Sequence, residues 1–156
     1  MFRVLLLSFL VAPLFGCGEA KPDRPPRQPT RGTLLYNGKP PNGAVIQFWP
    51  MPVAKVDWRT VKPSARVEAD GSFEINTYEL GDGAIVGEYA VTILWTGENP
   101  DVPRPDLFQG RYSNPQRPVT VVKIQEGENT LPPIQLKGPA VNPHDGWVDP
   151  VTNQKS

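Results

Sequence analysis

The distribution of proline and glycine is the feature that most limits what this chain can fold into. The sequence holds 20 prolines and 14 glycines among 156 residues, a level at which disorder competes with folding. Between residues 33 and 136, however, most of them stand between short apolar runs, where turns belong. Stretches long enough for a helix and free of both residues are missing, and proline interrupts helices. The sequence therefore favours a single domain built from short strands.

Seven short runs in this region carry strand signals. The clearest is 88–95, where apolar side chains alternate on both faces, as in a central strand buried from both sides. Asp70-Gly71 separates two of the runs and is a strong hairpin signal. Together the runs predict an all-β fold, a seven-stranded Greek-key β-sandwich, with a barrel of similar strand count as the alternative. The expected strands cover 33–36, 44–49, 65–69, 73–77, 88–95, 119–124 and 131–136.

The start of the chain has the pattern of a bacterial export signal. Arg3 is followed by an apolar run from Val4 to Phe15, which is too short to span a bilayer but suits a secretory leader. Leu14-Phe15-Gly16-Cys17 resembles the bacterial lipobox, and the resemblance implies a diacylglyceryl group on the Cys17 sulfur and cleavage before this residue. Cys17 is the only cysteine, so no internal disulfide is available. The expected product is held to a membrane by its acyl chains.

The chain divides into four expected segments. Residues 1–16 form the lipoprotein signal peptide, and residues 17–30 form a lipidated, proline-rich tether. Such a tether in an extended conformation would reach about 40 Å. Residues 31–137 form the sandwich, and residues 138–156, which lack periodicity, are expected to be a disordered tail.

Several motifs resemble one family. Gly32-Thr33-Leu34, Asn37-Gly38-Lys39-Pro40 and Asp70-Gly71-Ser72-Phe73, together with the segments 43–48 and 87–93, resemble carboxypeptidase regulatory-like domains. The resemblance is narrower still to small bacterial lipoproteins that carry one such domain. It implies a transthyretin-like (prealbumin-like) sandwich over residues 31–136. Because turn glycines and core residues carry most of the match, it implies a fold and not an activity.

Residue types suited to catalysis or metal binding are scarce. His144 is the only histidine, so neither a zinc site nor a Ser–His pair has its partners. Asp70, Glu79, Asp82 and Glu88 lie in or beside turns, which acidic side chains commonly stabilise, and they lack the alternating spacing of a calcium loop. Sixteen basic residues balance sixteen acidic ones, which argues against nucleic-acid binding. We therefore expect no metal, no cofactor and no enzymatic activity, with a hydrolase as the least favoured alternative.

Aromatic residues in the long loops are the remaining candidates for binding. Rings supply large contact area at little cost in entropy, so they can form a platform for a sugar or a protein. The alternative is that they close the ends of a small core. The expected function is that of a noncatalytic lipoprotein on the periplasmic or outer-membrane face of the cell envelope, in contact with an envelope protein or polysaccharide. A carbohydrate-binding module at the cell surface is the second hypothesis. The candidate residues are Trp49, Trp58, Tyr78, Phe108, Arg111 and Tyr112.

Overall fold

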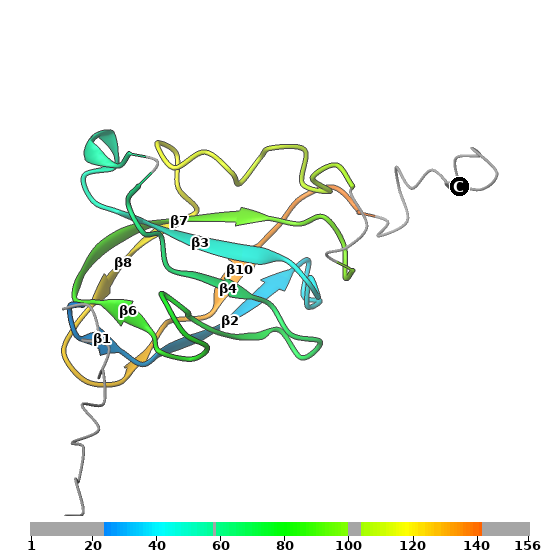
Figure 1. The fold of residues 1–156 in the computed structure, drawn as a ribbon. Coiled ribbons are helices and arrows are strands. Elements are labelled where there is room, and N and C mark those ends of the chain that lie inside the picture. Colours follow the sequence, from blue (N-terminus) through cyan, green and yellow to red (C-terminus); the bar gives the residue numbers. More distant parts are fainter. Residues whose placement is uncertain (1–23, 58, 100–103, 142–156) are drawn as a thin grey trace, which may run out of the picture.

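The computed structural model describes residues 24–57, 59–99 and 104–141. The expected signal peptide, Cys17, Trp58 and His144 lie outside the described residues. Apart from one 3₁₀ turn at Val53–Lys55, every regular element in the described ranges is a strand (Figure 1). The all-β prediction is therefore confirmed. A search of the same ranges for a helix long and apolar enough to cross a bilayer finds none.

Two four-stranded sheets make the body of the fold. The first has the order β4-β3-β7-β8 and is antiparallel throughout, whereas the second joins β10, β2 and β5, with β9 also paired to β2. In the second sheet β2 pairs antiparallel with β5 and parallel with β9 and β10. This arrangement is consistent with a β-sandwich. The strands are β2 Thr30–Tyr36, β3 Val45–Pro50, β4 Ser64–Arg66, β5 Ser72–Glu74, β7 Gly87–Leu94, β8 Thr120–Ile124, β9 Asn129–Thr130 and β10 Ile134–Leu136.

Each of the seven expected strands has a counterpart, but the structure adds three strands of two residues each. They are β1 (Arg27–Gln28), β6 (Ala84–Ile85) and β9. β1 and β6 pair antiparallel as a small separate sheet. A two-residue strand has no measurable periodicity, so sequence patterning cannot reveal it. The prediction of seven strands is therefore too low.

Alternation along the strands decides which side chains form the core. Ile46 and Phe48 on β3 are fully buried, while Val45, Gln47 and Trp49, which alternate with them, are partly exposed. On β7 the five consecutive residues from Tyr89 to Ile93 are all buried, and the strand pairs with β3 on one side and β8 on the other. The expectation of a central strand buried on both faces is confirmed.

The Asp70-Gly71 turn forms as expected, but the strands that it joins belong to different sheets. The Asp70 carboxylate accepts hydrogen bonds from the Ser72 amide and hydroxyl at 2.8 and 2.6 Å. β4 then pairs with β3, and β5 pairs with β2. The turn therefore carries the chain from one layer of the fold to the other.

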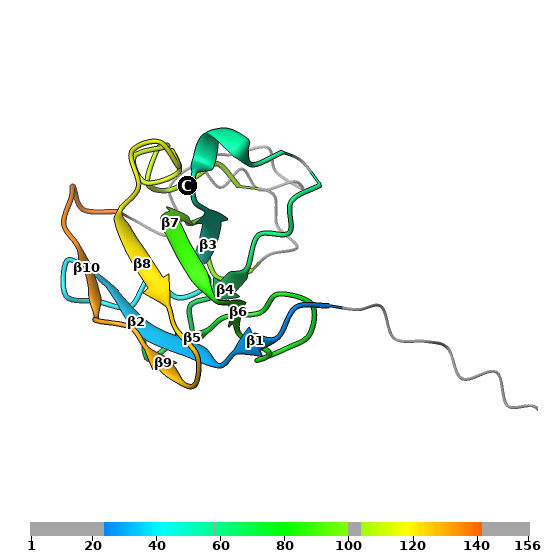
Figure 2. The ribbon, with the colours of Figure 1, turned by 90° about the vertical axis from the view of Figure 1, so that its left-hand side faces the viewer.

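The folded domain begins before the expected boundary at residue 31. Arg27 and Gln28 pair with Ile85 and Ala84, and Thr30 is buried at the start of β2. Residues 27–30 therefore belong to the domain and not to a free tether. Figure 2 shows β1 beside β6 at the end of the domain where the described chain starts.

The domain also extends past residue 137. The Tyr36 hydroxyl donates to the carbonyl of Pro139 at 2.7 Å, and the Asn37 amide donates to the carbonyl of Gly138 at 2.9 Å. Val141 packs against the core. Residues 138–141 are therefore fastened across the end of the sandwich, where the sequence predicted a disordered tail, and residues 142–156 lie outside the described part of the chain.

Candidate functional site

The structure divides the candidate binding residues among three places. Phe108, Arg111 and Tyr112 lie together at the end of the domain that also holds the turn after β2. Trp49 lies on the outer face of β3, and Tyr78 lies at the opposite end beside the N-terminal segment. The five candidates that the structure describes therefore do not form one continuous platform.

Phe108 is the centre of an aromatic cluster. Its ring centroid lies 4.9 Å from that of Tyr36, 5.4 Å from that of Trp95 and 5.1 Å from that of Tyr112. Phe108 is only 3% exposed. The polar groups of the cluster are also satisfied, since the Tyr112 hydroxyl donates to the Lys137 carbonyl and the Trp95 indole donates to the Asn42 carbonyl, both at 2.9 Å. This is the packing of a core that closes one end of the sandwich.

An aspartate turn places Phe108 in this cluster. The Asp106 carboxylate accepts hydrogen bonds from the backbone amides of Trp95 (3.1 Å), Phe108 (3.0 Å) and Gly110 (2.8 Å). Such a carboxylate fixes a loop because it takes up amides that would otherwise lack partners. Sequence reasoning did not single out Asp106, although an aspartate two residues before a loop aromatic is the local signal for this turn.

A cavity of about 250 Å³ lies beside the aromatic cluster. Tyr36 and Phe108 form part of its apolar wall, and Pro139 and the exposed Arg111 also line it. Burial raises the pKa of the Tyr36 hydroxyl, and the neighbouring Tyr112 raises it further, while the charge of Arg111 acts in the opposite direction. The hydroxyl therefore stays protonated at neutral pH and keeps its hydrogen bond to Pro139. The site can hold an apolar group, and the Asp106 carboxylate that also lines it is engaged by the three backbone amides described above.

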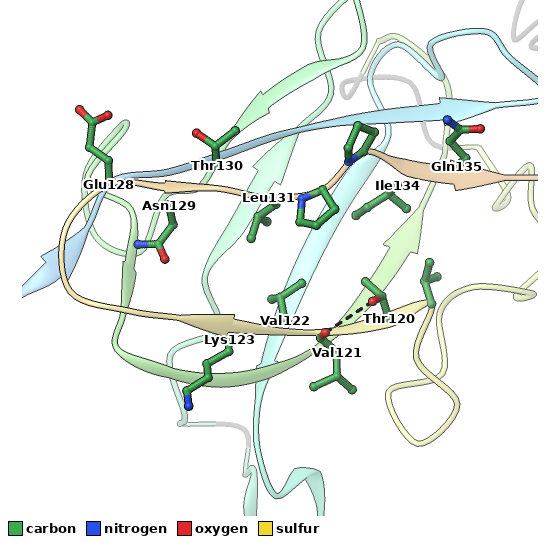
Figure 3. Close-up of a pocket in the computed structure, with 13 residues that line it drawn as sticks. Thr120, Val121, Val122, Lys123, Glu128, Asn129, Thr130, Leu131, Ile134 and Gln135 are labelled. Carbon is green, nitrogen blue, oxygen red and sulfur yellow. Dashed lines mark hydrogen bonds between the residues drawn. The ribbon is translucent and has the colours of Figure 1, made fainter.

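A second recess, of about 570 Å³, separates the edges of the two sheets (Figure 3). Among the described strands β8 pairs only with β7, so its other edge is unpaired. On the far side of the recess Pro132 and Pro133 have no amide hydrogen to offer. Val122 and Leu131 point between the strands in Figure 3 and are buried. An open edge of this kind can accept an extended chain, but its side chains specify no particular partner.

Trp49 is engaged on the outer face of the β4-β3-β7-β8 sheet. Its indole nitrogen donates to the Thr92 hydroxyl at 2.8 Å, and the Lys62 ammonium lies 5.3 Å from the ring centroid. The ring is partly exposed. It therefore keeps some surface for contact with a ligand, although its only hydrogen-bond donor already has a partner.

Tyr78 belongs to a group of four residues that we call the N-terminal clamp: Arg24, Arg27, Tyr78 and Asp82. The guanidinium carbons of Arg24 and Arg27 lie 4.5 and 5.4 Å from the Tyr78 ring centroid. Arg27 Nε also donates to Asp82 Oδ2 at 3.1 Å. Cation–π contacts and a largely buried ion pair thus hold the first described residues against the 76–83 loop.

The Asp82 carboxylate is the anchor of this clamp. Burial would raise its pKa, but hydrogen bonds from backbone amides, among them Thr77 at 2.7 Å and Tyr78 at 3.1 Å, together with the charge of Arg27 hold the pKa below its usual value. A lowered pKa means that the folded state prefers the charged form. The stability that Asp82 supplies is therefore fully present above the ordinary carboxyl pKa of about 3.9 and is lost as the pH falls through the lower folded value.

We expect Asp82→Asn to lower the free energy of unfolding by about 2 kcal/mol at pH 7, because several hydrogen bonds to a charged acceptor are lost. The difference from the unchanged protein should be smaller at pH 3, because the unchanged protein begins to lose this stabilisation once the pH falls below the ordinary carboxyl pKa. Urea midpoints at the two pH values measure it. Glu79→Gln, at an exposed neighbour, is the control and should change little. An equal deficit at both pH values would contradict the assignment of Asp82 as a charged anchor.

Metal ligands do not gather anywhere in residues 24–57, 59–99 and 104–141, where no three His, Cys, Asp or Glu side chains lie close enough to share an ion. The three aspartates of the main turns, Asp70, Asp82 and Asp106, are occupied by hydrogen bonds from their own loops. These carboxylates therefore act as turn anchors in the described part of the chain.

The comparisons with known proteins show no family. The sequence matches no protein-family model, and no curated protein sequence matches it. A crystal structure of a 9R-lipoxygenase from Cyanothece PCC8801 aligns with 71% of this chain at a TM-score of 0.35 and 17% identity, and the alignment covers 16% of the lipoxygenase chain. A similarity this distant carries no argument about fold or activity.

Proposed function

We propose that this chain is a noncatalytic bacterial lipoprotein of the cell envelope, anchored through Cys17 on a periplasmic or outer-membrane face. The observation that carries the proposal is the sequence Leu14-Phe15-Gly16-Cys17 at the end of an apolar leader, with the only cysteine of the chain at the position that would be acylated. Lipid attachment suffices to hold a protein to a bilayer without a spanning helix. The anchored part is then the all-β domain.

We also propose that the two sheets form a Greek-key sandwich of the transthyretin-like type. Support comes from the motifs that resemble carboxypeptidase regulatory-like domains, which fall on the turns and core strands of the fold. Asn37 and Gly38, for example, both have positive φ (50° and 78°) at the turn after β2, as a tight turn with this dipeptide requires. The noncatalytic role is supported by the structural use of Asp70, Asp82 and Asp106 in their own turns.

The anchor is tested by Cys17→Ser. We expect the unchanged protein to enter the detergent phase of a two-phase partition and the variant to stay in the aqueous phase, because the acyl chains are missing. Mass spectrometry of the N-terminal peptide should show the diacylglyceryl group on the sulfur. Phe15→Ala, which keeps the cysteine and brings a smaller residue beside Gly16, is the control and should remain lipidated. An unmodified sulfur in the native product would refute the proposal.

The second candidate function is carbohydrate binding, which the partly exposed ring of Trp49 favours. Saturable binding of the domain to an isolated envelope polysaccharide, lost in Trp49→Ala and kept in Val121→Ala, would establish it. Val121 is exposed on β8 of the same sheet, so it serves as a matched control. Binding that survives Trp49→Ala would instead point to a protein partner or to another surface.

A further inference from the structure

The N-terminal segment is fastened to one end of the domain by contacts of three kinds. β1 pairs with β6, and the N-terminal clamp joins Arg24 and Arg27 to Tyr78 and Asp82. The side chain of Gln28 also accepts a hydrogen bond from the Gly127 amide at 2.8 Å. The chain is therefore in contact with this end of the domain from Arg24 onward.

This attachment limits how far the domain can move from an anchor at Cys17. Seven residue steps separate Cys17 from Arg24, and even a fully extended chain covers at most about 25 Å in seven steps. A domain of about 100 residues has a radius of gyration of about 13 Å, hence a width of roughly 30–35 Å. The largest distance that seven residue steps can cover is therefore smaller than the domain itself.

The end that carries the clamp is distinct from the end that carries the aromatic cluster. β1, β6 and the 76–83 loop lie where β2 begins at Thr30, and the aromatic cluster lies where β2 ends at Tyr36 (Figures 1 and 2). Seven strand residues span about 20 Å. An anchor attached at the clamp therefore holds one end of the domain near the bilayer and leaves the other end free.

The surface of the clamp end fits a neutral lipid interface. Leu80, in the 76–83 loop, is 94% exposed, and Val86, just after β6, is 47% exposed. Arg24 and Arg27 offset Glu79 and Asp82 in formal charge, Arg27 is paired with Asp82, and Glu74 lies beside Gly81 of the same loop. Such a surface carries no excess of positive charge that would require anionic lipids.

We propose that the end formed by β1, β6 and the 76–83 loop faces the bilayer, with Leu80 at the level of the lipid headgroups and the aromatic-cluster end directed away from it. This orientation rests on the proposed acylation of Cys17. It leaves the end cavity and the turn at Asn37 and Gly38 on the side of the domain away from the bilayer.

The single cysteine makes the test direct. Once Cys17 is acylated, a thiol introduced elsewhere is the only one that a maleimide fluorophore can label. Leu80→Cys places the label at the clamp end, and Lys39→Cys, at an exposed position beside the turn after β2, places it at the other end. The lipidated full chain is incorporated in phosphatidylcholine vesicles that contain lipids with a nitroxide quencher on the headgroup. The label at residue 80 should lose most of its fluorescence, and the label at residue 39 should lose little.

A length variant provides the matched control. A Gly/Ser insert of about ten residues between Ala20 and Lys21 adds a flexible segment with an end-to-end distance of roughly 17 Å. It should reduce quenching at residue 80 while the protein still sediments with the vesicles. Equal quenching at residues 39 and 80 in vesicle-bound protein, or stronger quenching at 39, overturns the orientation alone. A native protein that stays in the supernatant with a free Cys17 thiol overturns the anchor, and the orientation with it.

Discussion

Replacing Phe108 with alanine is expected to lower the free energy of unfolding by about 3–5 kcal/mol, the range for removal of a large aromatic side chain from a core. The ring is almost fully buried and contacts three other aromatic rings. Its loss would leave a cavity that these rings cannot fill, because Tyr36, Trp95 and Tyr112 are each held by a hydrogen bond to backbone. Urea unfolding followed by tryptophan fluorescence measures the change.

Arg111→Ala is the matched control for this experiment. Arg111 lies three residues further along the same loop but is exposed, so its replacement should change the free energy of unfolding by less than about 0.5 kcal/mol. Comparison of the two variants shows whether the buried ring of Phe108, and not the loop as a whole, contributes to the stability of the core. A Phe108→Ala variant as stable as the unchanged protein would show that the aromatic cluster is not part of the core.

The strands could be predicted from the sequence because their patterns are local. β3 shows period-2 alternation and β7 is apolar on both faces. Their neighbours in the sequence carry turn residues, so a window of six to eight residues contains the whole signal. The pairing of these strands is not local. The Asp70-Gly71 turn illustrates the difference, since its sequence identifies the turn but not that β4 and β5 pair into separate sheets.

The candidate site could be predicted only in part, because its residues come from loops whose positions depend on distant contacts. An aromatic residue in a loop looks the same in sequence whether its ring is exposed, as in a binding platform, or buried, as for Phe108. Burial of Phe108 depends on the Asp106 turn and on rings from β2 and from the residue after β7. Tyr78 lies in the 76–83 loop and Trp49 lies in β3, and each meets other partners.

The sequence predicts a domain start at residue 31, which is too late, for a related reason. Residues 24–30 contain three prolines, a composition typical of a linker. The contacts that fasten them come from far along the chain, since Arg27 and its partner Asp82 are 55 residues apart. Only a compact turn at residues 76–83 presents the Asp82 carboxylate and the Tyr78 ring to the same segment. No local sequence pattern predicts that the N-terminal segment contacts this turn.

Gly83→Ala is expected to have the largest effect on this N-terminal attachment. Gly83 has a φ of +83°, and a Cβ atom there would overlap the carbonyl of Gln28 in β1. Left-handed backbone alone costs a non-glycine residue about 1–2 kcal/mol, and the overlap with backbone cannot be relieved by a rotamer change. We expect the free energy of unfolding to fall by about 3 kcal/mol or more, with β1 displaced from β6.

Gly38→Ala separates the two causes, because Gly38, in the turn after β2, has a similar φ of +78° but no heavy atom within 4 Å of the added Cβ. It should therefore lose only about 1–2 kcal/mol, the conformational cost. Urea unfolding gives the stabilities, and limited trypsin digestion reports on β1, since cleavage between Arg27 and Gln28 requires that this strand leave its partner. Faster cleavage in Gly83→Ala than in Gly38→Ala is the expected result. Equal stability loss and equal cleavage in the two variants would mean that the close approach of Gly83 to Gln28 does not hold the N-terminal segment in place.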